Sequence, residues 1–303
     1  MSEILVVGSL AYDSIETPAG KVDRALGGSA NYFSLAASLF AKVRVVGVVG
    51  EDYAEKDFAL LKSRNVDTSG MTVQAGKTFH WAGSYKDDMN EAITKLTELN
   101  VFEKFDPHLP EHYRDSKFVF LANISPDLQV KVLEQVKAPM FVGMDTMNFW
   151  ISSKLNDLKK VLQKVDIVLI NEGEAMMLTG AANGIAAAPK VCAMGPQAVV
   201  IKRGEYGFMM YSKEAGYFIL PAFPLDKVID PTGAGDTFAG GFFGHLASLG
   251  RAPKITDLKM ACLKGTILAS FTIQDFSVGA LAKTGLKDLD QRLEKYMQVI
   301  FHG

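Results

Sequence analysis

The sequence predicts an α/β protein in which a mostly parallel central sheet lies between two layers of helices. Short runs of β-branched and other apolar residues recur through the first two hundred residues, and segments with helical spacing separate them. The runs are continuously apolar, which indicates strands that are covered on both faces. Alternating strands and helices favour parallel pairing, because each parallel pair needs a long crossover connection that a helix supplies. We therefore expect a three-layer α/β/α sandwich formed by a single domain, residues 1–303.

The expected elements follow the chain in a regular order. Six apolar runs predict strands at residues 4–7, 43–49, 118–121, 140–144, 167–170 and 199–201. Apolar residues at every third or fourth position between these runs predict helices at residues 31–40, 54–64, 127–136, 155–164 and 172–178. Further along the chain the strands stop, and the spacing predicts helices at residues 234–249, 256–271 and 286–300. This last group is expected to form a helical layer that closes the domain.

Two stretches, residues 12–26 and 78–96, do not follow this alternation of strands and helices. In the second stretch, Phe79, Trp81 and Tyr85 occupy odd positions, whereas the even positions are mostly polar. An extended strand would place the aromatic rings on one face and the polar groups on the other. A small β lid over a cleft would use such a strand, and the alternative is a hairpin packed on the edge of the core. We predict a lid that contains both stretches.

Composition and charge exclude several classes of protein. The chain has 303 residues, of which 48% are hydrophobic and 22% charged, so it is an ordinary globular sequence and not a disordered or collagen-like one. Its net charge of −2 and its lack of a Lys/Arg cluster argue against nucleic acid as a partner. Cys192 and Cys262 lack the spacing of a zinc site or a disulfide framework, and no apolar stretch is long enough to cross a membrane. We expect a cytoplasmic protein that acts on a small molecule.

The most informative segment is DPTGAGDTF, residues 230–238, a glycine-rich turn that leads into an apolar helix. Gly233 and Gly235 let the backbone approach a ligand closely, and the free N–H groups at a helix start attract an anion. The carboxylate of Asp236 would repel a bound phosphate unless it has another task, such as accepting the proton of an attacking hydroxyl. The alternative is that Asp230 and Asp236 only cap the helix.

Three other glycine patterns are incomplete. Met71 stands where a P-loop needs its first glycine. Asn31 stands where the last glycine of a nucleophile elbow belongs, and Phe238 stands where the third glycine of a dinucleotide fingerprint belongs. P-loop NTPases, serine hydrolases and dehydrogenases are therefore not the first choices.

Segment 230–238 resembles the C-terminal signature of the ribokinase-like, or PfkB, family of carbohydrate and nucleoside kinases at all nine positions. Gly27 and Gly28 resemble the diglycine region of that family, and residues 171–174, NEGE, are similar to its NxxE motif. The resemblance implies an ATP-dependent kinase that transfers the γ-phosphoryl group to a hydroxymethyl group of a sugar. An adenosine-kinase-type nucleoside kinase is the alternative, and a catalytically silent nucleotide-binding regulator is a third reading.

The same resemblance implies a catalytic role for the glycine-rich turn. Asp236 becomes the base that activates the acceptor hydroxyl, and the backbone of Gly233, Ala234 and Gly235 becomes an anion hole. This arrangement is chemically coherent, because phosphoryl transfer needs alignment and neutralised charge more than covalent chemistry. The loop of Asp230 is implied as a place for a monovalent cation such as K⁺.

Further residues are implied to bind ATP and Mg²⁺. Glu174 would support Mg²⁺ through water, with Asn171 in the same network, and the alternative is that these two form a capping pair at a helix start. Gly204 would leave room for the nucleotide, and Thr232 would belong to the same site. Lys202 would face a phosphate, and the alternative is a solvated lysine at the end of a strand.

The acceptor is implied to bind near the first strand and the diglycine. Asp13 can accept hydrogen bonds from two neighbouring hydroxyl groups, and Asn31 adds a donor and an acceptor. Gly27 and Gly28 complete this part of the site. Ala11 stands where ribokinases carry an asparagine, so one sugar contact is missing or comes from elsewhere, which puts ribose itself in doubt.

The aromatic face of the predicted lid offers a further hypothesis. Phe79, Trp81 and Tyr85 would stack on a nucleobase, which would favour a nucleoside over a free sugar. The alternative is that these rings pack on a neighbouring strand or on a second subunit, since an exposed aromatic β face needs cover. A homodimer through the lid is therefore expected beside the small-molecule acceptor.

Overall fold

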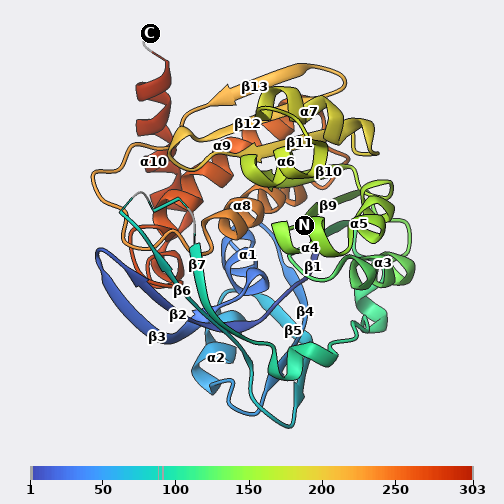
Figure 1. Ribbon diagram of the computed structural model, residues 1–303, viewed down its shortest axis with the longest axis vertical. Coiled ribbons are helices and arrows are strands. Elements are labelled where there is room, and N and C mark those ends of the chain that lie inside the picture. The colour runs from blue at the N-terminus through green and yellow to red at the C-terminus, as the bar shows by residue number, and fades with distance from the viewer. Residues whose placement is uncertain (1–2, 88, 91, 302–303) are drawn as a thin grey trace.

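The central sheet contains nine strands within residues 3–87, 89–90 and 92–301, the parts of the chain that a computed structural model describes (Figure 1). Seven strands are parallel, in the order β5-β4-β1-β8-β9-β10-β11, and β12 and β13 extend the sheet as an antiparallel edge hairpin. In chain order these strands are β1 (Ile4–Val7), β4 (Val43–Gly50), β5 (Val66–Gln74), β8 (Phe118–Leu121), β9 (Phe141–Asp145), β10 (Ile167–Asn171), β11 (Ala198–Lys202), β12 (Phe208–Ser212) and β13 (Gly216–Leu220). The prediction of a mostly parallel sheet is confirmed.

Helices cover both faces of this sheet, which confirms the three-layer sandwich (Figure 1). One layer consists of α1 (Ser29–Ala37), α2 (Glu55–Ser63), α8 (Ala234–Ser248), α9 (Ile255–Thr272) and α10 (Leu286–Ile300). The other layer consists of α3 (Pro126–Gln135), α4 (Asn148–Ser153), α5 (Leu155–Leu162), α6 (Glu172–Thr179) and α7 (Gly184–Ala193). Short 3-10 helices lie at η1 (Asn100–Lys104), η2 (Glu111–Tyr113), η3 (Gly204–Tyr206) and η4 (Leu281–Lys283). Strand β1 lies between the two helical layers. Its residues Ile4 and Val6 pack in one hydrophobic core, and Leu5 and Val7 pack in the other.

Strands β5, β12 and β13 and helices α4 and α7 were not predicted from the sequence. Strand β5 contains Asp67, Ser69 and Gly70, which are typical of turns, yet it pairs with β4 along the edge of the sheet. Gly70 is required there by packing, since a Cβ would lie 2.6 Å from the carbonyl oxygen of Val45. Helix α7 contains Pro189, and a proline inside a segment argues against a helix. These elements therefore depend on tertiary contacts more than on local pattern.

The two stretches outside the alternation form a separate four-stranded sheet, so the predicted small second sheet is confirmed. We call this sheet the lid, and that it covers a cleft stays a prediction. Its order is β3-β2-β6-β7, and its strands are β2 (Ala11–Thr17), β3 (Gly20–Gly27), β6 (Phe79–Tyr85) and β7 (Ala92–Glu98). Strands β2 and β6 are parallel, and the two outer pairs are antiparallel. The lid is tied to the C-terminal part of the chain, because Thr17 donates a 2.8 Å hydrogen bond to the carbonyl of Ile229 and Ser277 donates to the carbonyl of Leu26.

Among the residues that the structure describes, the cysteines show no disulfide, and the helices show no membrane span. Cys192 and Cys262 are both buried free thiols, so they form no disulfide with each other. Across the described residues, no helix combines the length and the apolar character needed to cross a membrane.

Candidate active site

The predicted catalytic and nucleotide-binding residues meet at the carboxyl ends of the central strands. Asn171 is the last residue of β10 and Lys202 the last residue of β11, and the two are paired in the sheet register. Asp236 lies in the first turn of α8, whose N-terminus faces this edge. Ligands of open α/β sheets bind at the carboxyl ends of the strands, so the location fits a binding site.

The glycine-rich turn leaves backbone donors free at the start of α8. Gly233 is the N-cap of this helix with a left-handed φ of 75°, which favours glycine. The N–H group of Ala234 donates to the carbonyl of Pro231 at 3.2 Å. The N–H groups of Gly233, Gly235 and Asp236 have no acceptor in the part of the chain that the structure describes. The turn can therefore offer three N–H groups to an anion, aided by the helix dipole.

Asp236 has the ionisation behaviour that a general base needs. Burial, together with the neighbouring carboxylate of Asp145, raises the pKa of Asp236 to about 7, against the opposing effect of Lys202. A carboxylate whose pKa lies near the working pH can both accept and release a proton. The geometry thus places a tuned carboxylate directly beside the free N–H groups of the turn.

Lys202 is buried and paired, so it is not a solvated lysine at a strand end. Its Nζ lies 2.9 Å from Oδ2 of Asp145, and its side chain is 19% exposed. Burial lowers the pKa of Lys202, but the carboxylates of Asp145, Glu174 and Asp236 outweigh burial and raise it. A Cβ on Gly235 would lie 2.9 Å from this Nζ, so the ammonium group lies against the predicted anion hole.

Sequence reasoning missed Asp145. It is the last residue of β9 and directly follows the predicted strand at residues 140–144. The NxxE resemblance selected Asn171 and does not extend to Asp145. The signal that could have found Asp145 is its position as a polar residue at the carboxyl end of a buried strand. Its carboxylate accepts the N–H of Thr146 at 2.7 Å and is buried in the cluster with Lys202.

Asn171 and Glu174 form a capping box at the start of α6. The side chain of Asn171 accepts the N–H of Glu174 at 2.8 Å, and Oε2 of Glu174 accepts the N–H of Asn171 at 3.0 Å. Burial, with the carboxylate of Asp145, raises the pKa of Glu174 to about 7. The capping alternative therefore describes the local geometry, and the carboxyl group still faces the charged cluster.

The carboxylates of Asp145 and Glu174 fit Mg²⁺. Their mutual repulsion and burial disfavour two bare charges, and a divalent cation would relieve both effects. Among the described residues, no group of three or more His, Cys, Asp or Glu side chains forms a metal cage. Mg²⁺ in kinases is held by one or two carboxylates together with phosphate and water, so this donor set suits it.

The predicted acceptor residues surround the diglycine at the end of β3. A Cβ on Gly27 would lie 1.9 Å from Oδ2 of Asp13, and Gly28 has a left-handed φ of 88°. Burial raises the pKa of Asp13 to about 7, with further effect from Asp230 and Asp236, although the N–H of Gly28 opposes it. Asp13 and Asp236 therefore lie close enough to influence each other across the site.

Asn31 lies beneath the diglycine with both ends of its amide occupied. Its Nδ2 donates to the carbonyl of Gly27 at 2.6 Å, and its Oδ1 accepts the hydroxyl of Tyr53 at 3.2 Å. The side chain is completely buried. This geometry gives Asn31 a positioning role for the diglycine, and its contact with an acceptor stays a prediction.

We expect the Gly27→Ala variant to bind the acceptor poorly. The added methyl group must displace the Asp13 carboxylate, and loss of a hydrogen bond to a charged group costs about 1.5–3 kcal/mol. The KM for the acceptor should rise at least roughly tenfold, whereas the KM for ATP should change little. Gly285→Ala is the matched control, because Gly285 has a φ of −116° and the nearest atom to its Cβ would be 3.6 Å away. If Gly285→Ala raised the KM for the acceptor as much as Gly27→Ala does, the role of Gly27 beside Asp13 would be contradicted.

The remaining predicted residues connect the site to the lid. The Asp230 carboxylate accepts the N–H groups of Thr232 at 2.9 Å and of Ser277 at 3.1 Å, so it braces the glycine-rich turn. The hydroxyl of Thr232 donates to the hydroxyl of Tyr85 in β6 at 3.1 Å. Gly204 has a left-handed φ of 55°, and a Cβ there would lie 3.0 Å from Oδ1 of Asn90, between β6 and β7. The lid thus contacts the residues expected to bind the nucleotide.

The three lid aromatics have different surroundings. Phe79 stacks on Phe102 with ring centroids 5.3 Å apart and planes at 14°, so it belongs to a packed cluster. Tyr85 contacts Thr232, as described above. Trp81 is half-buried, is paired with Asp13 in the β2–β6 register and therefore shares its face of the lid. Its ring lies over Gly83, and its Nε1 donates to Thr94 at 3.2 Å.

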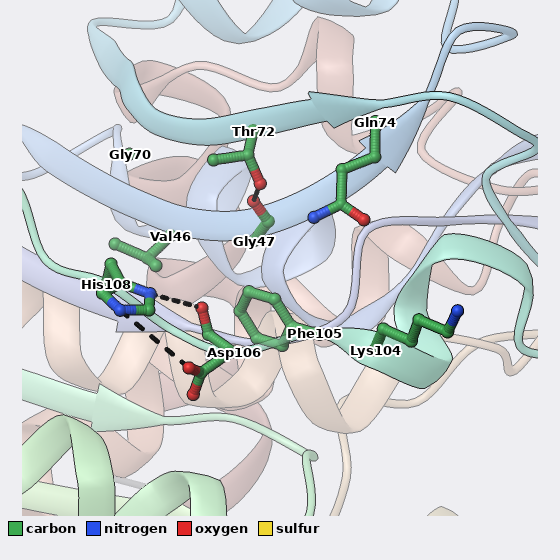
Figure 2. Close-up of a pocket in the computed structure, with 9 residues that line it drawn as sticks. All are labelled: Val46, Gly47, Gly70, Thr72, Gln74, Lys104, Phe105, Asp106 and His108. Carbon is green, nitrogen blue, oxygen red and sulfur yellow. Dashed lines mark hydrogen bonds and ion pairs between the residues drawn. The ribbon is translucent and has the colours of Figure 1, made fainter.

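A second feature, a cavity of about 230 Å³, lies at the β4–β5 side of the sheet (Figure 2). Val46 and Phe105 provide apolar walls, and Gln74, Lys104 and His108 provide polar groups. None of the predicted site residues lines this cavity. It is therefore separate from the cluster around Asp236.

The fold and the cluster define a phosphotransferase that acts on an alcohol group. The sequence model of the pfkB family of carbohydrate kinases matches residues 1–284. The chain belongs to this family, and it is a ribokinase-family kinase.

Similar proteins agree with this assignment. A cytidine kinase of Thermococcus kodakarensis is 33% identical over 249 residues, which cover 80% of this chain and 87% of that protein. A Burkholderia thailandensis nucleoside kinase solved with inosine has a TM-score of 0.80 at 21% identity, and the match covers 97% of this chain and 99% of that chain. An Escherichia coli protein solved with ATP and Mg²⁺ has a TM-score of 0.79 at 18% identity, with 97% and 100% covered. The predicted ribokinase-like fold is confirmed.

Proposed function

We propose that this protein is a nucleoside kinase that transfers the γ-phosphoryl group of ATP to the hydroxymethyl group of a nucleoside. The observation that carries the proposal is the position of Trp81, which shares one face of the lid with Asp13. An indole in this position suits a nucleobase while Asp13 binds hydroxyl groups of the attached sugar. A free sugar would use Asp13 and Asp236 but has no base that could lie against the indole. The 33% identical cytidine kinase supports the same choice.

The chemistry follows from the cluster at the start of α8. Asp236 accepts the proton of the acceptor hydroxyl, the hydroxyl oxygen forms a bond to the γ-phosphorus, and the bond to the β–γ bridging oxygen breaks to release ADP. The N–H groups of Gly235 and Asp236, with the ammonium of Lys202, hold the charge of the transferred group. Mg²⁺ bound beside Asp145 and Glu174 would neutralise part of the phosphate charge.

The decisive experiment measures ADP release from MgATP with cytidine, adenosine, inosine, ribose, fructose and fructose 6-phosphate as acceptors. Asp236→Asn protein provides the background rate. Turnover of a nucleoside without turnover of the free sugars would support the proposal. Turnover of a free sugar alone would indicate a sugar kinase. Nucleotide binding without any turnover would favour a catalytically silent nucleotide-binding regulator.

We expect Trp81→Ala to weaken nucleoside binding. Stacking of a base on an aromatic side chain contributes about 1–3 kcal/mol, so the KM for the nucleoside should rise roughly 5- to 150-fold with little change in the KM for ATP. The sequence contains two tryptophans, so a Trp150→Phe background isolates the Trp81 fluorescence, which should change on nucleoside addition. Phe79→Leu is the matched control in the same strand, because Phe79 stacks on Phe102. An unchanged KM in Trp81→Ala would count against base stacking.

Two further expectations stay predictions. One is activation by K⁺ near the Asp230 loop, and the other is a homodimer through the lid. On the lid face turned away from Asp13, Ile93 and Leu96 are 45% and 44% exposed, so they are the residues such a dimer would cover.

A further inference from the structure

Tyr32 is a buried tyrosine beside the catalytic cluster whose hydroxyl has no partner. It lies in α1, its side chain is 1% exposed, and its hydroxyl forms no hydrogen bond within the described residues. By contrast, the buried hydroxyls of Tyr53 and Tyr113 donate to Oδ1 of Asn31 and to the carbonyl of Asp67. A buried polar group without a partner costs stability, so its retention calls for an explanation.

The ring of Tyr32 packs directly on the glycine-rich turn. A Cβ on Gly233 would lie 2.4 Å from Cζ of the ring and 2.5 Å from Cδ1 and Cδ2. Gly233 therefore needs to be glycine for two reasons, its left-handed φ and the ring above it. The phenol is thereby held between the catalytic turn and the diglycine that precedes α1.

The phenol is surrounded by the carboxylates of the site. Burial raises its pKa well above the usual value, and Asp13, Asp230 and Asp236 raise it further, with the effect of Asp13 first among the charges. A neutral phenol is a hydrogen-bond donor, whereas ionised carboxylates can only accept. Tyr32 thus supplies a side-chain O–H donor on the acceptor side of the cluster.

A substrate hydroxyl group that is buried needs both a hydrogen-bond acceptor and a hydrogen-bond donor as partners. It donates its hydrogen to one group, and its oxygen accepts from another. Asp13 provides the acceptor, but a carboxylate leaves the oxygen of the bound hydroxyl without a donor. The unpaired O–H of Tyr32 is the complementary group.

We propose that Tyr32 binds the acceptor, donating a hydrogen bond to the oxygen of the hydroxyl group whose hydrogen Asp13 accepts. The inference rests on the proposed function, because it takes the acceptor to be a nucleoside with sugar hydroxyls. The hydroxyl concerned is one that stays on the sugar and is not phosphorylated. Tyr32 and Asp13 would together select a sugar that carries this hydroxyl over one that lacks it.

The test combines Tyr32→Phe with deoxynucleosides. For the nucleoside that the wild type phosphorylates, the variant should show a KM raised roughly 3- to 10-fold, with the KM for ATP unchanged. With the wild type, one of the 2′-deoxy and 3′-deoxy analogues should show a KM raised by at least this factor, because the missing hydroxyl loses its hydrogen bonds to both Tyr32 and Asp13. The same analogue should lose little more with Tyr32→Phe, because the hydrogen bond is already absent. If the KM increase caused by Tyr32→Phe multiplied the KM increase caused by removing a hydroxyl, for the 2′-deoxy and the 3′-deoxy analogue alike, the inference would be overturned.

The Tm measured without ligand shows whether the hydroxyl of Tyr32 serves substrate binding or the stability of the fold. Tyr32→Phe removes an unpaired hydroxyl and keeps the ring, so its Tm should equal or exceed that of the wild type. Tyr113→Phe is the matched control, because its hydroxyl donates to the carbonyl of Asp67 at 2.8 Å away from the site, and it should lower Tm without changing any KM. A clear fall in Tm for Tyr32→Phe would also overturn the inference.

The two proposals fail in different ways. If the wild type phosphorylates no nucleoside, the proposed function fails, and this inference fails with it. If the wild type phosphorylates a nucleoside and Tyr32→Phe leaves its KM unchanged, only the role of Tyr32 is wrong.

Discussion

The Asp236→Asn variant is expected to lose at least roughly 100-fold in kcat, because removal of a general base costs this much or more. Asparagine keeps the size of the side chain and the start of α8 but cannot accept a proton. Steady-state kinetics with the best nucleoside would measure the loss. The wild type should also lose activity as pH falls below about 7, since Asp236 must be ionised to act, and its pKa is raised to about 7.

The same variant is expected to be more stable than the wild type at neutral pH. Burial raises the pKa of Asp236 in the folded protein above its ordinary value of 3.8, so the folded state binds a proton more tightly than the unfolded state. Stability from this group is complete below about pH 4 and is lost as pH rises through about 7. Asparagine carries no charge, so the Tm of the variant should exceed that of the wild type above pH 7 and approach it in acid.

Asp157→Asn is the matched control for both effects. Asp157 carries the same side chain on the surface of α5, where it pairs with Lys160 at 2.8 Å. Its substitution should change neither kcat nor the pH dependence of activity. An Asp236→Asn enzyme that is folded and nearly as active as the wild type would remove Asp236 from catalysis. A variant that is inactive and also less stable above pH 7 would contradict the raised pKa.

The main lines of the fold could be predicted because its central strands are short and continuously apolar. The parallel sheet also brings the ends of its strands together, so Asn171 and Lys202, which the family resemblance singled out, meet at one edge of the sheet. Asp145 ends the neighbouring strand in the same way, but the motifs do not contain it and the predicted strand ended one residue before it. The glycine-rich turn was found for a different reason, since few local structures need glycine, aspartate and a helix start in that order.

The parts that could not be predicted depend on which way a side chain faces. Every residue of α1 is buried, so helical periodicity gives that helix no distinct face and cannot single out Tyr32. The alternation in β6 placed Phe79 and Trp81 on one face, but it could not show that Phe102 would stack on the first ring or that Thr94 would accept a hydrogen bond from the second. The contact of Asn31 with the acceptor stays a prediction, but its bonds to Gly27 and Tyr53 could not be foreseen from the sequence. Such contacts come from distant parts of the chain.

The Lys202→Met variant is expected to lose both stability and activity. Methionine keeps most of the length of the side chain but leaves the buried carboxylate of Asp145 without its partner. Loss of one member of a buried ion pair costs about 3–5 kcal/mol. The kcat should fall roughly 100- to 1,000-fold, as when one donor to the reacting charge is removed. Urea unfolding and steady-state kinetics would measure the two losses.

The pH dependence of this variant provides a sharper readout than its rate alone. Lys202 lowers the pKa of both Asp236 and Glu174, so its removal should raise both pKa values further. The acidic limb of the pH–rate profile should therefore move to higher pH than in the wild type. Lys160→Met is the matched control, because that lysine is exposed and pairs with Asp157 on one helix, where an ion pair contributes little to stability.

The double variant Lys202→Met/Asp145→Asn separates the two roles of the lysine. Neutralising Asp145 removes the unpaired charge, so most of the lost unfolding free energy should return. The activity should not return, because the cation beside Gly235 is still absent. If the double variant recovered its kcat along with its stability, Lys202 would serve only to hold Asp145. If instead Lys202→Met alone kept its stability and lost only kcat, the ammonium group would act on the phosphoryl group without being needed to balance the cluster.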